Sequence, residues 1–294
     1  MVLALLAAWL FAAASSAEAQ THQVPAAAAP SAEYPFSFKA YGVFRQMITQ
    51  RNYLPVVALK DAAAGRTTDT VGAVSGLRGE ISIIEGRLIV SYGIDCGATC
   101  PAPASETATL LATASVQHWR PVTIDKDLDA EGVATFIRAQ AKANGLDENN
   151  PFSFRINGAI TDFVMHVNAA PNPRFKGHGS FDEMAITGLA KGPRLAGSVV
   201  GFYAPPPLQG VITHMGDYFH AHYVDERRTT TAHLDSYGVA AGSILMLPNQ
   251  TDSAPGRFVL PSGGATSGGA HGFDEFLDLE AEFAALARQE LRRL

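Results

Sequence analysis

Residues 218–226 read Tyr218-Phe219-His220-Ala221-His222-Tyr223-Val224-Asp225-Glu226, an alternation that is typical of a β-strand. Because strand side chains repeat every second residue, His220 and His222 should point from the same face. A polar connection follows, and Ala232-His233-Leu234 then begins a second segment with strand character, so a hairpin would bring His233 alongside the first two histidines. Three imidazoles from one hairpin indicate a metal site with an open coordination position. A His-x-His pair alone is common in strands, so the prediction of a metal site depends on the third histidine.

The composition predicts a folded protein with a substantial hydrophobic core. The chain has 294 residues, of which 47% are hydrophobic and 17% charged, and its formal net charge is −6 at pH 7. That length is enough for one large domain or two modest ones. The sequence contains no run of Lys and Arg and no basic stripe interleaved with aromatic residues, so nucleic acid is not an expected partner.

The N-terminus has the pattern of a secretory signal peptide. Met1 to Ala14 is an apolar run, and the small residues Ala17 and Ala19 would allow cleavage after Ala19, although a positively charged start is missing. We therefore expect residues 1–19 to be removed and the protein to be secreted or periplasmic, without stable membrane insertion. An uncleaved anchor is the alternative.

The two cysteines of the chain, Cys96 and Cys100, lie four residues apart. Two cysteines cannot form a four-cysteine zinc site, and their spacing is not that of a Cys-x-x-Cys redox motif. In an exported protein they are predicted to form a local disulfide, which closes too short a ring to add much stability.

The domain organisation is predicted from composition and chain breaks. We expect a mixed α+β fold of two sheet-based domains, with mixed β-sheets, flanking helices and the metal hairpin in the C-terminal domain. Glu148-Asn149-Asn150-Pro151 breaks the chain and suggests the boundary. The predicted parts are a disordered lead-in at 20–34, an N-terminal α/β domain at 35–150, a metal-binding domain at 151–250, a linker at 251–272 and a helix at 273–294.

Several local elements are also predicted. Asp129 should cap a helix that runs to about Asn144 with one apolar face. Glu85-Gly86 and Asn157-Gly158 are each expected to form the turn of a β-hairpin, and residues 168–193 to be an irregular surface connection.

Four further segments bear on the function, and they occur in a definite order: Tyr41-Gly42-Val43-Phe44, Gly76-Leu77-Arg78-Gly79-Glu80, Phe154-Arg155-Ile156-Asn157-Gly158 and Gly197-Ser198-Val199-Val200-Gly201-Phe202. Together with the spacing of His220, His222, Asp225-Glu226 and His233, they resemble the α-acetolactate decarboxylase family. Each segment alone is weak evidence. The resemblance rests on the fact that all of them occur in the same order as in the family.

The resemblance implies zinc-dependent decarboxylation of 2-acetolactate, or a close analogue, to acetoin and CO2. It gives the zinc-ligand role to His220, His222 and His233, and it maps the family's catalytic carboxylate to Glu80 and its catalytic arginine to Arg155. Zinc would stabilise the enediolate left by loss of CO2, the guanidinium would orient the substrate, and the carboxylic acid would return a proton stereospecifically. Without the resemblance, Glu80 is expected to be a solvated turn residue and Arg155 a surface strand residue. The resemblance also implies a homodimer.

The chain departs from the family pattern near the predicted site. Ala73 stands in place of a threonine, Phe219 in place of a tyrosine, and Thr231-Ala232 in place of Gly-Gly. The family also uses a glutamate from its C-terminal tail, for which Glu275, Glu280 and Glu282 are equivalent candidates here. These departures bear on the substrate more than on the metal.

The remaining histidines have weaker interpretations. His214 is predicted to be a loop histidine, with a role as an extra acid or base as the alternative. No convergent partner is predicted for His118, His166, His178 and His271.

Two other function classes remain open at this stage. A cupin-like metal dioxygenase or isomerase is one, because His220, His222 and Glu226 imitate a His-x-His-x3-Glu ligand set, although the expected later histidine is missing. A secreted non-catalytic descendant that keeps the scaffold and zinc is the other, and Ala73 is its main support.

Overall fold

The computed structural model describes residues 36–62, 65–93, 102–178, 183–249 and 257–261. All of these residues fall within one compact unit. The predicted signal peptide, the lead-in, Cys96, Cys100, the C-terminal helix and its three glutamates lie outside the described residues, so these predictions stay predictions. None of the described helices is long and apolar enough to cross a membrane.

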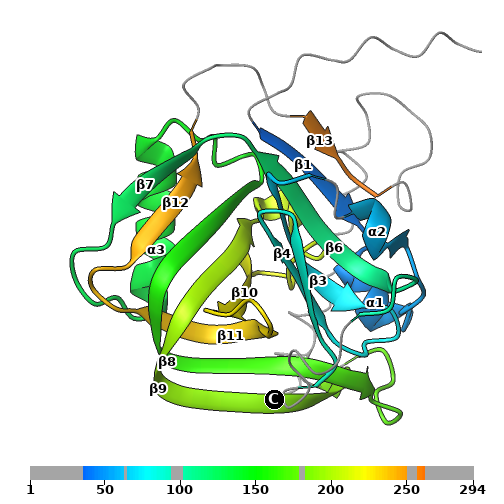
Figure 1. Cartoon of the computed structure of the whole chain (residues 1–294). Coiled ribbons are helices and arrows are strands. Elements are labelled where there is room, and N and C mark those ends of the chain that lie inside the picture. Colours follow the sequence, from blue (N-terminus) through cyan, green and yellow to red (C-terminus); the bar gives the residue numbers. More distant parts are fainter. Residues whose placement is uncertain (1–35, 63–64, 94–101, 179–182, 250–256, 262–294) are drawn as a thin grey trace, which may run out of the picture. The chain divides into compact units, whose positions relative to one another are not determined.

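The first sheet has the strand order β13-β1-β6-β3-β4-β5, and β2 pairs with β6 (Figure 1). Its strands are β1 (Phe36–Tyr41), β2 (Val57–Ala58), β3 (Thr68–Val74), β4 (Glu80–Ile84), β5 (Arg87–Ser91), β6 (Thr107–Val116) and β13 (Arg257–Val259). All neighbours are antiparallel except β1 and β13, which are parallel. The β4–β5 hairpin at Glu85-Gly86 is confirmed, whereas the segment predicted as a linker contains β13.

The second sheet has the order β11-β10-β9-β8-β12-β7 and is antiparallel throughout its described pairings. Its strands are β7 (Trp119–Thr123), β8 (Phe152–Pro171), β9 (Ala185–Tyr203), β10 (Phe219–Asp225), β11 (Thr231–Val239) and β12 (Ile244–Pro248). Strand β11 also pairs with β8, so the pairings β8–β9–β10–β11–β8 form a closed circuit. This closure brings residues of β8 next to the β10–β11 hairpin.

Helices are few among the described residues: α1 (Phe44–Thr49), α2 (Leu59–Ala62), α3 (Ala130–Ala143) and the 3-10 turn η3 (Pro206–Leu208). The predicted helix after Asp129 is confirmed, because the Asp129 side chain accepts a 2.8 Å hydrogen bond from the Gly132 N–H and so caps α3. Val133, Ile137 and Ala141 form its buried face. The prediction of a mixed α+β fold built on two sheets is therefore confirmed, with strands predominating.

The largest hydrophobic core joins both sheets, since it contains Phe38 of β1 as well as Phe154 of β8 and Phe202 of β9. The boundary predicted at residue 150 does not coincide with the division between the sheets. Strand β7 precedes that residue, yet it pairs with β12 of the second sheet. Which strands pair depends on long-range packing. A local break in the sequence gives no information about that pairing.

The hairpin predicted at Asn157-Gly158 is wrong. Strand β8 runs through both residues without a turn, and its partner β9 begins within the segment predicted to be irregular. A Cβ atom on Gly158 would lie 2.2 Å from Ser243 Oγ, so the glycine here allows another segment to approach closely.

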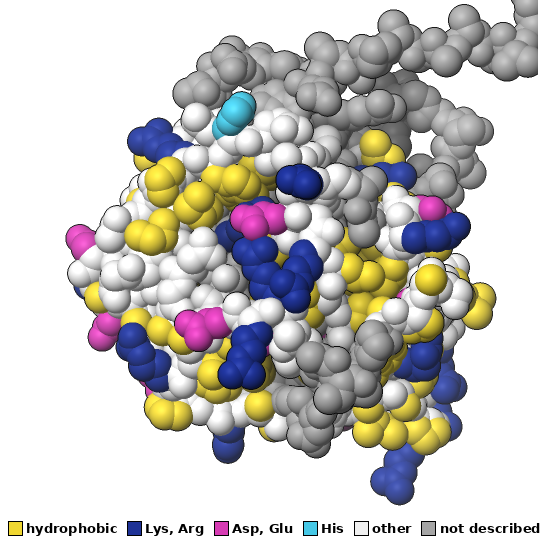
Figure 2. All heavy atoms as spheres, in the orientation of Figure 1, with side chains coloured by type: hydrophobic (Ala, Val, Ile, Leu, Met, Phe, Trp, Pro, Cys, Tyr) yellow, Lys and Arg dark blue, Asp and Glu magenta, His cyan; other side chains and the backbone are white. Residues whose placement is uncertain are grey.

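Charged side chains of both signs lie among hydrophobic and uncharged ones on the face shown in Figure 2. Both sheets contribute side chains to one cavity in the interior.

Candidate metal centre

Three histidines converge on the second sheet. His220 and His222 are on β10, His233 is on β11, and His222 and His233 are direct partners in the antiparallel register. One ligand atom from each lies within 4.8 Å of the others. The ring centroids are nearly equidistant, at 5.0, 5.1 and 5.4 Å. The structure therefore brings the three histidines together on one hairpin, as the sequence predicted.

The donor atoms have the spacing that a metal ion requires. His220 Nε2 and His222 Nε2 are 3.2 Å apart. Two nitrogen ligands about 2.0–2.1 Å from a tetrahedral zinc ion are separated by roughly 3.4 Å, so the two imidazoles need little movement to share an ion.

Neighbouring groups orient both rings of β10. His220 Nδ1 lies 2.7 Å from the Ile212 carbonyl oxygen, which can only accept, so the Nδ1–H of His220 donates this bond. His222 Nδ1 lies 3.3 Å from Ser82 Oγ, and Ser82 Oγ is 2.6 Å from Thr231 Oγ1. The carbonyl contact fixes the tautomer of His220 and leaves its Nε2 for a metal, and the serine contact helps to hold the ring of His222.

Burial keeps these histidines neutral. Desolvation lowers the pKa of His220 to about 4 and holds those of His222 and His233 well below the usual value. The neighbouring imidazoles lower the pKa values of His222 and His233 further. Neutral imidazole is the form that binds a metal, so all three rings are ready to act as ligands at neutral pH.

Glu80 reaches the cluster from the first sheet, as its predicted role requires. Its side chain is buried, and Glu80 Oε2 lies 3.6 Å from His222 Nε2. Oε1 accepts hydrogen bonds from the Asn168 backbone N–H at 3.2 Å and from Asn168 Nδ2 at 2.5 Å. Burial raises the pKa of Glu80 to about 7, against the opposing effects of His166 and Asn168. A carboxyl group with this pKa can give and take a proton near neutrality.

Arg155 is not brought to the cluster and does not line the cavity. Its Nε and Nη2 donate to the two oxygens of Asp69 at 2.5 and 2.7 Å, and its Nη1 donates to Glu85 at 2.9 Å. The guanidinium also stacks on the Trp119 ring at 4.5 Å. In this structure the arginine is part of a buried ion pair between the sheets, and its predicted catalytic role stays a prediction.

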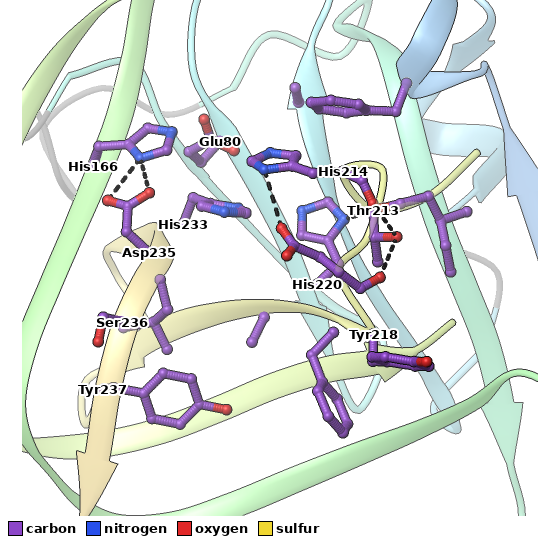
Figure 3. A pocket seen from close by; sticks show the side chains of 18 of the residues that line it. Glu80, His166, Thr213, His214, Tyr218, His220, His233, Asp235, Ser236 and Tyr237 are labelled. Atoms are coloured by element: carbon purple, nitrogen blue, oxygen red, sulfur yellow. Dashed lines mark hydrogen bonds and ion pairs between the residues drawn. The ribbon is translucent and has the colours of Figure 1, made fainter. Parts of the chain in front are cut away.

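Two histidine–aspartate pairs at the site were missed by sequence reasoning. His166 of β8 contacts Asp235 of β11, and His214 contacts Asp217 in the loop before β10. Both histidines line the cavity (Figure 3). The sequence carries no signal for His166, because the β8–β11 register alone brings it opposite His233. His214 is a loop histidine, as predicted, and it also lines the cavity; its role as an extra acid or base stays a prediction.

The cavity around the cluster has a volume of about 560 Å³. Much of its wall is apolar, from residues such as Phe44, Leu110, Ile137 and Met184, and Ala73 and Phe219 also line it. The three carboxyl groups in the wall belong to Glu80, Asp217 and Asp235. In the part of the chain that the structure describes, the lining contains neither Lys nor Arg.

A group of three neutral histidines, two of them buried, with a protonatable carboxyl group beside it and a cavity in front, is typical of a mononuclear metal site. Residues 66–251 match the family model described as alpha-acetolactate decarboxylase. That match covers more than half of the chain, so the protein belongs to the alpha-acetolactate decarboxylase family.

The fold is also similar to solved structures of that family, at low sequence identity. The alpha-acetolactate decarboxylase from Bacillus subtilis strain 168 has a TM-score of 0.59 and 14% identity, over 77% of this chain and 89% of that chain. A Staphylococcus aureus protein of unknown function, described as similar to alpha-acetolactate decarboxylase, has a TM-score of 0.55 and 14% identity, over 82% of this chain and 99% of that chain. No curated protein gives a significant sequence match.

Proposed function

We propose that the protein is a zinc-dependent carboxy-lyase that converts 2-acetolactate, or a close analogue, to acetoin and CO2. The observation that carries the proposal is the three-histidine cluster with Glu80 beside it, at a cavity in a member of this family. Loss of CO2 from a 3-oxo acid needs a polarised carbonyl group and a controlled proton donor, and this cluster offers the residues for both.

His220, His222 and His233 would hold the ion. Their three nitrogen donors and lack of thiolates suit zinc with one open position, which is the ligand pattern of catalytic zinc sites. When bound, zinc supplies a Lewis acid for the oxygen atoms of the substrate. The Ile212 carbonyl and Ser82 hydroxyl hold the rings of His220 and His222 in the orientation that this requires.

Glu80 would handle the proton that replaces CO2. Asn168 holds Oε1 through two hydrogen bonds, so Oε2 is the oxygen directed to the cluster. A pKa of about 7 lets the carboxyl group deliver a proton and recover it at neutral pH. A donor fixed on one side of the substrate accounts for stereospecific protonation.

The apolar wall would hold the alkyl groups of the substrate and exclude water. Ala73 and Phe219, which replace the expected threonine and tyrosine, both line the cavity and remove two hydroxyl groups from it. We therefore propose an apolar-substituted 2-hydroxy-3-oxo acid as the substrate class. An exported location and a homodimeric state are further proposals, which rest on the N-terminal pattern and on the family.

A direct assay tests the function. Zinc-loaded protein is incubated with racemic 2-acetolactate, and acetoin is measured with and without a chelator, beside His222→Ala and the exposed control His178→Ala. We expect acetoin from the wild type and the control, and none after chelation or from His222→Ala. Absence of metal-dependent acetoin refutes the proposal. Bound iron with O2 consumption would favour a cupin-like oxygenase, and bound zinc without turnover of any keto acid a non-catalytic protein.

A further inference from the structure

The cavity that contains the three-histidine cluster is much larger than the smallest substrate of the proposed reaction requires. Its volume of about 560 Å³ lies in the range of pockets that hold a drug-sized ligand. In 2-acetolactate the ends of the four-carbon chain lie three bonds apart, which is about 3.8 Å, the distance between consecutive Cα atoms. An acid of that size at the cluster leaves most of the cavity unfilled.

The additional space follows strand β11. His233 and Tyr237 both line the cavity, and Figure 3 shows Tyr237 further along the strand from His233. Four residue steps of a β-strand span about 13 Å. The pairing of β11 with β8 is irregular on both sides of Ser236, which lines the cavity as well. The cavity therefore continues from the metal ligands into a region that a four-carbon acid at the cluster does not reach.

Helix α3 forms an apolar wall of this region. Ala130, Val133, Ala134 and Ile137 all line the cavity. These positions are i, i+3, i+4 and i+7, so they share one face of the helix, and together they extend over about 10 Å of its axis. The helix packs against β11. All four side chains are aliphatic, so this wall suits an apolar group of the ligand.

We propose that the substrate is a 2-hydroxy-3-oxo acid with a long apolar substituent on C2, which extends from the three-histidine cluster along α3 towards Tyr237. The inference rests on the proposed function, which places the polar groups of the acid at the cluster. The reaction itself is the same. The bond between the carboxyl carbon and C2 breaks, its electron pair passes to the C3 carbonyl group, CO2 leaves, and a proton takes its place on C2.

Unreactive acids test the inference without turnover. The probes are 2-hydroxy-2-methylbutanoate and 2-hydroxy-2-methyloctanoate, which carry an ethyl and a hexyl group and lack the oxo group that decarboxylation needs. Each is titrated by calorimetry into zinc-loaded wild type, Ala134→Leu, Ala134→Phe and Ala139→Phe. Ala139 is an exposed residue of α3 outside the cavity lining, so Ala139→Phe is the matched control. Bound zinc and the unfolding temperature are measured for every variant.

We expect the wild type and Ala139→Phe to bind the hexyl acid at least about tenfold more tightly than the ethyl acid. Full burial of one CH2 group strengthens binding about fourfold, so four additional groups exceed tenfold even when they are only partly buried. Ala134→Phe fills the space beside α3 and should reduce this ratio to within about threefold, with the zinc content unchanged. Ala134→Leu should give an intermediate ratio. The ethyl acid should displace the hexyl acid, because both occupy one site.

A wild-type ratio below about tenfold would overturn the inference, and so would a hexyl acid that the ethyl acid does not displace. The wild-type ratio in Ala134→Leu and in every folded Ala134→Phe sample would overturn it too, as would an equal loss of the ratio in Ala139→Phe.

The acetoin assay separates this inference from the proposed function. A wild type that releases acetoin from 2-acetolactate but has no preference for the hexyl acid overturns the inference and leaves the function standing. A wild type that prefers the hexyl acid but decarboxylates neither 2-acetolactate nor 2-hexyl-2-hydroxy-3-oxobutanoate refutes the proposed function and leaves the long-chain site standing. In an active enzyme we expect the larger kcat/KM for the 2-hexyl substrate, and a larger value for 2-acetolactate would overturn the substrate assignment.

Discussion

Replacement of Arg155 by methionine separates the two roles that this residue can have. The Arg155 and Asp69 side chains are 7% and 0% exposed, and two hydrogen bonds join them. Arg155→Met leaves the Asp69 carboxylate buried without its counterion, which costs about 3–5 kcal/mol in the free energy of unfolding. Arg194→Met, on an exposed position of β9, should change it by less than about 0.5 kcal/mol.

The destabilisation should depend on pH in a definite direction. Burial already raises the pKa of Asp69 against the effect of Arg155, and removal of the guanidinium raises it further. A group with a raised pKa in the folded state contributes stability at low pH that is lost as the pH rises through that pKa. The difference between Arg155→Met and the wild type should therefore be smaller at pH 5 than at pH 8. Urea denaturation at the two pH values measures it.

A second substitution and an activity assay complete the test. Asp69→Asn combined with Arg155→Met removes the buried charge, and we expect it to recover most of the lost stability. Folded Arg155→Met, assayed with saturating substrate at low temperature, should keep kcat within about threefold of the wild type. A variant of normal stability whose kcat falls by about a hundredfold or more would refute the structural role and establish the catalytic one.

Three further predictions concern the cluster. In metal-free protein, Glu80→Gln should be about 3 kcal/mol more stable than the wild type at pH 8, and the difference should be smaller at pH 5. The reason is that the folded state raises the pKa of the Glu80 carboxyl group from 4.5 to about 7. Equal free energies of unfolding in urea at pH 8 would contradict this prediction. Zinc should be retained after dialysis between pH 7 and pH 5, because protons compete for His220 only near its pKa of about 4 and the pKa values of His222 and His233 also lie well below 6.5; release between pH 7 and pH 6 would contradict ligation by these three histidines. Ser82→Ala should weaken zinc binding about tenfold or more in competition with a chromophoric chelator, unlike Ser198→Ala, because the contact with His222 is lost; equal affinities would exclude this support.

Short-range patterns in the sequence predicted the local elements well. Alternation put His220 and His222 on one face of a strand, and the spacing to His233 predicted the hairpin partner. The α3 helix and the β4–β5 hairpin were likewise predictable, because capping residues, turn residues and periodicity act over a few positions.

The same kind of reasoning failed where a local signal competed with long-range pairing. Asn157-Gly158 is a strong turn dipeptide, yet the chain continues as one strand because β9 and β12 pair with β8 on either side of it. The glycine serves a close approach to Ser243 instead. Tertiary packing overrides a turn preference when the alternative buries a long strand.

The sequence by itself predicted the three histidines of the candidate metal site and, through the family resemblance, Glu80. Only the tertiary structure placed Glu80 of the first sheet beside His222 of the second, paired Arg155 with Asp69, and brought His166 and Asp235 into the cavity. The physical reason is the range of the interactions. Side-chain periodicity is a property of consecutive residues, whereas the pairing between sheets depends on the burial of the whole core, which no single stretch of sequence encodes.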